Sequence, residues 1–119
     1  MENNILLESG TNELEVLEFM VGGQNFGINI AKVVEIMNYQ PIVPVPDSPE
    51  EFEGVFTPRD KVISVIDLHK VLHKESPDKE HDLLIICHFN QMDMGFHVSS
   101  VKGIQRISWE DIEKPPRIS

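Results

Sequence analysis

Large hydrophobic residues occupy every second position in two neighbouring stretches of the chain, residues 16–21 and 26–30. This period of two is typical of a β-strand that buries one face. The pair Gly22-Gly23 lies between the stretches and favours a tight turn, because glycine adopts positive φ freely. The pattern therefore predicts a β-hairpin. The next apolar residues, Val33, Ile36 and Met37, have a looser spacing that favours a short helical turn or bend.

The same pattern recurs 68 residues further along the chain. Residues 84–104 align with residues 16–36 without a gap, and the hydrophobic residues keep their steps of two. Three aligned pairs are identical, namely Gly27 with Gly95, Val33 with Val101, and Ile36 with Ile104. Three identities alone are weak evidence, but an ungapped match of both pattern and turn is stronger. The sequence therefore predicts two copies of one β unit.

Further elements lie between the two copies. Residues 41–49 contain four prolines, which exclude a helix or a central strand because proline has no N–H donor and a fixed φ. Ser48, Pro49 and Glu51 follow the pattern of an N-cap, a first-turn proline and a capping acid, which predicts a short helical turn at residues 49–52. The β-branched run at residues 62–66 predicts a buried strand, followed by a short helical segment at 69–73.

Together these elements predict an all-β protein with two barrel-like lobes. We expect an N-terminal arm at residues 1–15 and a domain at residues 16–119. The first lobe is expected to span about 16–74 and the second about 82–119, with a charged linker between them. The arm either docks elsewhere or is a frayed terminus, and both alternatives stay open.

The second copy of the unit looks shorter than the first. The first copy ends with the predicted strand 62–66, and its counterpart 68 residues later would be 130–134, beyond the last of the 119 residues. The second lobe is therefore expected to be incomplete, with one unpaired sheet edge. We expect this open edge to cause self-association by strand addition or exchange, or to leave residues 83–89 weakly protected from hydrogen exchange.

Composition narrows the class of partner. The net charge of −10 argues against nucleic-acid binding and against an anionic membrane surface, because like charges repel. No apolar run approaches the roughly 20 residues that span a bilayer, and the first residues have no signal-peptide character. The single cysteine, Cys87, excludes an internal disulfide and fits a reducing compartment. We expect a cytoplasmic protein without membrane insertion.

Catalytic and metal-binding patterns are weak. His69 and His73 stand four residues apart, which can present two imidazoles to one metal ion, but Lys70 replaces the glutamate of a metalloprotease helix. Cys87 and His88 are neighbours on a predicted strand, where their side chains point to opposite faces. We therefore expect no enzyme activity, no cofactor and no metal site. A metal-dependent hydrolase built on His69 and His73 is the alternative.

Two charged residues are candidates for partner binding. Arg59 lies at a predicted turn between apolar strands, where it either binds a carboxylate of a partner or is a solvent-exposed turn charge. Glu35 lies among apolar residues and is either the rim of an interface or a plain surface residue.

Several short motifs, taken in order, resemble the CheW-like coupling domain of bacterial chemotaxis. The resemblance covers nearly all of the chain, and the ordered set is specific although each motif is weak. Residues 5–15 are closer still to the CheV subgroup, in which such a domain precedes a response-regulator receiver. The motifs are Phe26-Gly27-Ile28-x-Ile30, Val33-x-Glu35-Ile36, the proline-rich loop, Glu53-Gly54-Val55, Arg59, Val62-Ile63-x-Val65-Ile66-Asp67-Leu68, and Gly95-Phe96-x-Val98-x-x-Val101.

This resemblance implies a scaffold of two five-stranded barrels without catalytic residues. Such a scaffold links the cytoplasmic helices of chemoreceptors to the regulatory domain of the histidine kinase CheA. By resemblance, the kinase-binding residues are Val33, Glu35, Ile36 and Gly54, and the receptor-binding residues are Arg59, Val98 and Val101. An adaptor for a different sensory kinase is the alternative among binding proteins.

The chain departs from the family pattern at three places. Residues 57–60, Thr-Pro-Arg-Asp, stand where the family has Asn-Leu-Arg-Gly, Ser64 replaces a proline, and residues 97–101 replace Val-Asp-x-Val. Aspartate adopts left-handed backbone less freely than glycine, so the turn at Arg59 is expected to differ from that of the family.

Overall fold

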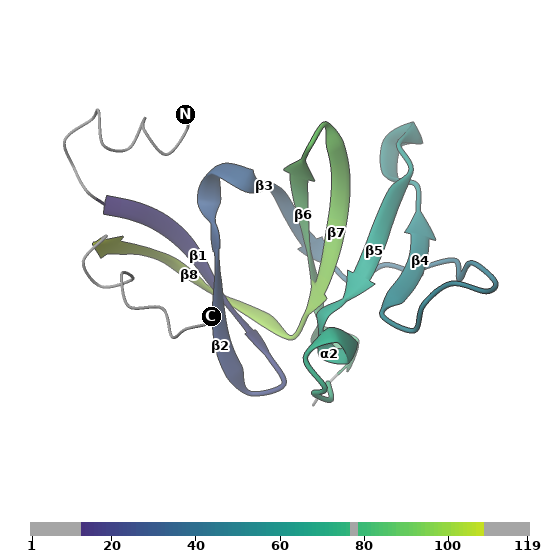
Figure 1. The fold of residues 1–119 in the computed structure, drawn as a ribbon, viewed down its shortest axis with the longest axis horizontal. Coiled ribbons are helices and arrows are strands. Elements are labelled where there is room, and N and C mark those ends of the chain that lie inside the picture. The colour runs from purple at the N-terminus through teal and green to yellow at the C-terminus, as the bar shows by residue number, and fades with distance from the viewer. Residues whose placement is uncertain (1–12, 77–78, 109–119) are drawn as a thin grey trace.

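The computed structural model describes residues 13–76 and 79–108, and these residues form eight strands in two sheets (Figure 1). The prediction of an all-β protein is confirmed. Among the described residues no helix is long and apolar enough to cross a bilayer. The strands are β1 (Glu13–Val21), β2 (Gln24–Asn29), β3 (Val33–Asn38), β4 (Phe52–Phe56), β5 (Ile63–Asp67), β6 (Leu83–Phe89), β7 (Met92–Val98) and β8 (Ser100–Ser108).

The internal repeat predicted from the sequence is present in the structure. Strands β1, β2 and β3 of the first copy correspond to β6, β7 and β8 of the second at the offset of 68 residues. Both hairpins turn through two residues with positive φ, Gly22 (60°) and Gly23 (90°) in the first and Asn90 (48°) and Gln91 (66°) in the second. This is the turn geometry that matches the twist of two antiparallel strands.

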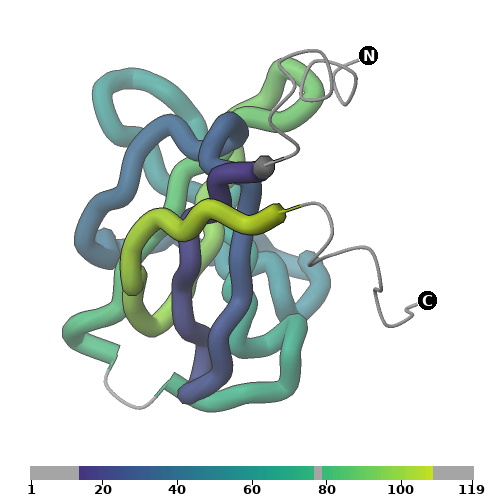
Figure 2. Tube along the Cα trace, turned by 90° about the vertical axis from the view of Figure 1, so that its left-hand side faces the viewer, coloured from purple at the N-terminus to yellow at the C-terminus, as the bar shows by residue number. Residues whose placement is uncertain are grey.

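The third strand of each copy pairs with the other copy. Strand β3 lies antiparallel to β6, with Val33 opposite Cys87, and β8 lies antiparallel to β1, with Val101 opposite Phe19. These two pairings are equivalent under the 68-residue offset, and each strand carries a bulge at the equivalent place. Figure 2, in which the three-stranded sheet faces the viewer, shows β8 lying beside β1.

The exchange of strands explains how the lobes are built. One sheet has the order β2-β1-β8 and the other has the order β3-β6-β7-β5-β4, so each combines strands of both copies. Among the described residues neither sheet closes into a barrel. The helical turn predicted for residues 33–37 is wrong, because this segment pairs with β6 as β3. The turn occurs earlier, as the 3₁₀ turn η1 (Ile30–Lys32), which Asn29 caps through its side chain.

The central segment completes the five-stranded sheet. Strand β5 runs parallel to β7, and β4 runs antiparallel to β5. Two short helical elements follow β5, the single turn α2 (Leu68–Val71) and the 3₁₀ turn η3 (Lys79–His81). At the predicted turn of residues 49–52, the N–H of Phe52 donates to the carbonyl of Pro49 over 3.0 Å, but β4 already begins at Phe52.

The core consists of two apolar clusters. The first contains Leu17, Phe19, Val21, Ile85, Cys87 and Val98, and therefore combines both copies of the repeat. The second lies within the five-stranded sheet and contains Phe56, Ile63, Val65, Leu84 and Ile86. Burial of the first cluster, worth roughly 1.5–3 kcal/mol for each large apolar side chain, holds the two sheets together.

Candidate interaction surface

Strand β3 presents apolar side chains to solvent at one edge of the five-stranded sheet. Val34 is 57% exposed and Ile36 is 41% exposed, although both are large hydrophobic residues. Their neighbours Val33 and Met37 are half-buried and pack against the first and second core clusters respectively. An edge strand with adjacent exposed apolar residues is a typical place for another protein to dock.

An ion pair lies beside this strand. The Nη2 atom of Arg59 donates to the Oε1 atom of Glu35 over 2.7 Å, and the side chains are 70% and 36% exposed. The sequence indicated both residues separately and assigned them to different partners. The structure brings them together, and an exposed pair of this kind contributes little to stability, about 0–1 kcal/mol.

The turn that presents Arg59 has an unusual backbone. Arg59 and Asp60 have φ of 52° and 65°, in the left-handed region that glycine prefers. The N–H of Lys61 donates to the carbonyl of Pro58 over 3.1 Å, and the Nζ atom of Lys61 lies 2.6 Å from Asp93 on β7. The turn therefore accommodates aspartate where the family pattern has glycine.

A shallow cavity of about 390 Å³ lies next to the ion pair. It extends from β3 to the turn at Arg59, so the cavity, the ion pair and the exposed edge of β3 are continuous. We call this combined area the β3 surface, defined by Val34, Glu35, Ile36 and Arg59. The residues that line the cavity are Met37, Gln40, Pro41, Phe56, Thr57, Pro58 and Arg59.

Gly54, the fourth predicted kinase-binding residue, is buried. Its φ is 143°, and a Cβ atom at this position would clash with the carbonyl oxygen of Val43. Val43 exchanges two backbone hydrogen bonds with Val55, of 2.8 and 3.0 Å, which tie the proline-rich loop to β4. Gly54 therefore allows the loop to approach the sheet closely.

The predicted receptor-binding residues do not form one cluster. Val98 is fully buried in the first core cluster, and Val101 is half-buried on β8. Arg59 precedes β5, whereas Val98 ends β7, and these two strands are parallel. Arg59 and Val98 consequently lie at opposite ends of the five-stranded sheet (Figure 1).

His69 and His73, the pair on which the alternative hydrolase depends, do not come together in the structure. Helix α2 ends at Val71, so the spacing of four residues does not place the two imidazoles on one helical face. His73 has a φ of 58° and is exposed, whereas His69 is buried. His69 instead contacts Asp67 through its Nδ1 atom, over 2.9 Å, and Ser99 through its Nε2 atom, over 2.8 Å.

His97 is the centre of a buried polar network that the sequence analysis missed. Its Nδ1 atom lies 2.8 Å from Glu53 and its Nε2 atom lies 2.7 Å from Asp82, and Tyr39 donates to the other oxygen of Glu53. Burial alone would lower the pKa of His97, but the two carboxylates outweigh it and raise that pKa. Burial and the bond to Glu53 raise the pKa of Tyr39.

Comparisons with known proteins all point to one family. The CheW-like domain family matches residues 15–119. The chain is 35% identical over 113 residues to the chemotaxis protein CheV3 of Helicobacter pylori, covering 86% of this chain and 36% of that protein. It is 29% identical over 111 residues to the chemotaxis protein CheW of Treponema pallidum, covering 89% of this chain and 65% of that protein.

A solved structure has the same fold. The scaffolding protein TtCheW from Thermoanaerobacter tengcongensis superposes with a TM-score of 0.80 at 28% sequence identity, covering 89% of this chain and 73% of that one. The chain spans 36% of the CheV3 relative and just under two thirds of the Treponema relative, at 65%.

Proposed function

The chain belongs to the CheW-like domain family, and on that premise we propose that it is a non-catalytic chemotaxis adaptor that couples chemoreceptors to the histidine kinase CheA. The observation that carries this proposal is the β3 surface. On this surface, exposed apolar side chains at a sheet edge lie beside the Glu35–Arg59 ion pair, which contributes little to the stability of the fold because it is exposed. An adaptor that docks through this surface brings the kinase and the receptor together by binding alone, without a catalytic step.

We assign kinase binding to the β3 surface. Ile36 provides exposed apolar area, Glu35 provides charge at the rim, and Val33 orients the strand by packing against the first core cluster. Gly54 acts indirectly, by letting the proline-rich loop pack against β4. Apolar area gives affinity and the charged rim gives specificity and association rate.

We assign receptor binding to Arg59 together with the β7–β8 corner. Val101 is partly accessible at the start of β8, whereas Val98 supports this corner from the core. Because Arg59 lies at the other end of the sheet, a receptor helix that contacts both places has to extend along the sheet. A helix of about 20 residues spans roughly 30 Å and has the length for this.

The described residues do not favour the alternative hydrolase. His69 faces the interior and His73 lies outside α2, so these residues do not form the metal pair on which that alternative depends. Asp67, His69 and Ser99 form a hydrogen-bonded chain, but the Oγ atom of Ser99 also accepts from the N–H of Gly22 over 3.0 Å. This arrangement fixes Ser99 as a structural residue.

Self-association is a second proposal, through the outer edge of β2. Among the described residues β2 pairs only with β1, whereas its repeat counterpart β7 lies between β6 and β5. An unpaired edge of this kind accepts a strand from a second copy. Strand β6 at residues 83–89 is a central strand, so the predicted weak protection should appear in β2 instead. Sedimentation velocity at several concentrations tests this, and a concentration-independent monomer would contradict it.

The adaptor proposal is tested by titrating the purified chain against the regulatory domain of CheA. We expect saturable binding with one chain per kinase domain, and no binding to the regulatory domain of an unrelated sensory kinase. Binding only to the unrelated kinase would favour the alternative adaptor, and binding to neither would contradict the proposal. A variant with Ile36→Arg is the matched control, since it should abolish the signal while the chain stays folded.

A further inference from the structure

Three buried side chains converge where β5, α2 and β7 meet. Asp67 ends β5, His69 lies in α2, and His97 is the partner of Asp67 in the parallel pairing of β5 with β7. Each offers one metal-ligating atom, and these atoms all lie within 4.8 Å of one another. Because sheet register and a capped helical turn position all three, the cluster is rigid.

The two imidazoles direct the same nitrogen towards the same carboxylate. The Oδ1 atom of Asp67 lies 2.9 Å from Nδ1 of His69 and 3.7 Å from Nδ1 of His97. Bonds of about 2.0–2.1 Å at tetrahedral angles place two zinc ligand atoms roughly 3.3 Å apart, between these two distances. Small side-chain rotations therefore suffice to place one ion among the three atoms.

The opposite nitrogen of each imidazole already has a hydrogen-bond partner. Nε2 of His69 lies 2.8 Å from the hydroxyl of Ser99, and Nε2 of His97 lies 2.7 Å from the carboxylate of Asp82. Metal-binding histidines almost always have such a partner, because it fixes the tautomer and orients the ring. Asp82 is itself held by Ser76, whose Oγ lies 2.8 and 3.0 Å from its two oxygens.

The charge of the cluster also favours a cation. Three carboxylates, those of Glu53, Asp67 and Asp82, surround the two imidazoles, and Glu53 lies 2.8 Å from Nδ1 of His97. Even with one imidazole protonated, the group keeps an excess of negative charge in a mostly buried place. Buried carboxylates require compensation, which a divalent ion supplies.

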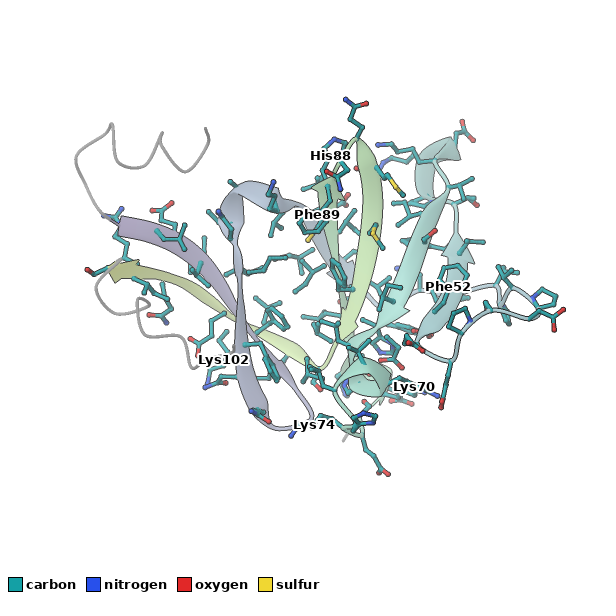
Figure 3. All side chains as sticks on the ribbon, in the orientation of Figure 1. Phe52, Lys70, Lys74, His88, Phe89 and Lys102 are labelled. Atoms are coloured by element: carbon teal, nitrogen blue, oxygen red, sulfur yellow. The ribbon has the colours of Figure 1, made fainter. Side chains whose placement is uncertain are left out.

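A route from solvent reaches the cluster. A cavity of about 470 Å³ opens beside α2, and both Asp67 and His69 line it. Lys70 and Lys74, labelled in Figure 3, line the same cavity on the outer side of α2. An ion can therefore enter without opening the sheet.

We propose that Asp67, His69 and His97 bind one divalent transition-metal ion of the zinc class, with Glu53 next to them as the fourth ligand. Imidazole and carboxylate ligands together suit Zn²⁺, whereas Ca²⁺ and Mg²⁺ prefer oxygen ligands alone. Because the four residues come from β4, β5, α2 and β7, the ion ties the five-stranded sheet to the α-helical turn α2.

Titration of chelator-treated, tag-free protein with Zn²⁺ tests the proposal. We expect one equivalent per chain and a higher melting temperature. His69→Gln and His97→Gln should each weaken binding by more than about 100-fold, and Asp82→Asn, which removes the negative charge of the group beside Nε2 of His97, by about 10–100-fold. His73→Gln and His88→Gln are matched controls on exposed histidines, and should leave the affinity unchanged.

Substitution with Co²⁺ gives a measurement that does not depend on folded variants. The unmodified chain with one equivalent of Co²⁺ should show the intense visible absorption of a four-coordinate site. A weak six-coordinate spectrum, failure to bind one equivalent of Zn²⁺, or loss of binding in His73→Gln with retention in His97→Gln would each overturn the proposal. Should His97→Gln fail to fold by circular dichroism, the Co²⁺ spectrum and the Asp82→Asn affinity decide.

Discussion

The third strands of the two repeat copies, β3 and β8, have equivalent places in the fold but different surfaces. Each is an edge strand, each pairs with the first strand of the other copy, and each carries a bulge at the same position. On β3 the bulge residue is Val34 and the next exposed residue is Ile36. On β8 the corresponding residues are Lys102 and Ile104, the latter 58% exposed.

The neighbouring charges differ as well. Glu35 on β3 pairs with Arg59 from a turn of the same sheet, next to a cavity. On β8, Gln105 and Arg106 bond to Glu18 and Glu15 of the adjacent strand β1. Gln105 and Arg106 of β8 therefore bond to the adjacent strand of their own sheet, whereas Glu35 of β3 bonds to a turn that borders a cavity. The repeat accounts for the equivalent fold positions of β3 and β8, and we propose that the residues that differ between the copies determine where a partner binds.

The largest change in kinase affinity is expected from replacing the exposed apolar residue of β3, Ile36. Ile36→Arg should raise the Kd for the CheA regulatory domain by more than about 30-fold, the size expected for a buried interface hot spot. Ile104→Arg, at the equivalent position on β8, should change it by less than about threefold. Calorimetric titration measures both, and melting curves check that both variants fold. Equal losses in the two variants would contradict the assignment to β3.

A smaller effect is expected from reversing the charge of Glu35. Glu35→Arg removes the carboxylate and places two cations side by side, so kinase binding should weaken by about tenfold, mainly through a slower association rate. The free energy of unfolding should change by no more than about 1 kcal/mol, because the pair is exposed. The control is Glu15→Arg, which breaks the exposed ion pair with Arg106 in the three-stranded sheet and should leave binding intact. Unchanged affinity in a folded Glu35→Arg variant would remove this residue from the site.

Arg59→Ala should lower receptor coupling by a few-fold. We expect receptor coupling to fall more than kinase binding, since Arg59 exposes 70% of its side chain beyond its contact with Glu35. Reconstituted arrays of receptor, kinase and adaptor measure coupling, and titration of the kinase domain alone measures binding. Arg106→Ala is the control on β8. An equal loss of both functions, together with a lower melting temperature, would show that Arg59 is structural.

The smallest expected effect is on the stability of the fold, and it comes from Asp93, a residue that distinguishes the second hairpin from the first. His88 and Lys61 bond to Asp93 over 2.6 Å each, whereas Met20 and Asn25 occupy the positions equivalent to His88 and Asp93 in the first hairpin. The bonds from Lys61 and then His88 lower the pKa of Asp93. The ionised carboxylate is thus favoured by folding.

The lowered pKa of Asp93 determines the pH range over which this residue stabilises the fold. The contribution of Asp93 is present above the unfolded pKa of about 3.9 and is lost as the pH falls through the lower folded pKa. Urea unfolding of the unmodified chain and of Asp93→Asn should differ slightly at pH 7, and the difference should shrink towards pH 2. A difference that grows on acidification would contradict the direction of the shift.

Local patterns were sufficient to predict much of the fold. The alternation and the turn residues predicted both hairpins, and the β-branched run predicted β5 to within one residue. The exchange of β3 and β8 was not predictable in this way, because it depends on contacts between residues far apart in the sequence. Val33 pairs with Cys87 in the structure, and nothing near Val33 specifies that partner.

The candidate sites show the same limit. Glu35 and Arg59 were singled out one at a time, but only the folded sheet places them 2.7 Å apart. His69 was noticed through its spacing to His73, a helical argument that fails because α2 has a single turn. Its actual neighbour His97 is set by the parallel register of β5 with β7, which no local pattern reveals. Val98 was assigned to a binding surface although its apolar alternation equally predicted the core.

Hydrogen exchange with and without the CheA regulatory domain decides whether β3 binds the kinase. We expect binding to slow exchange in residues 33–38 and 57–60, which contain the β3 surface. We expect no change in residues 100–108, which form the equivalent strand β8. Protection of residues 100–108 without protection of residues 33–38 would contradict the claim that β3 is the surface that binds the kinase.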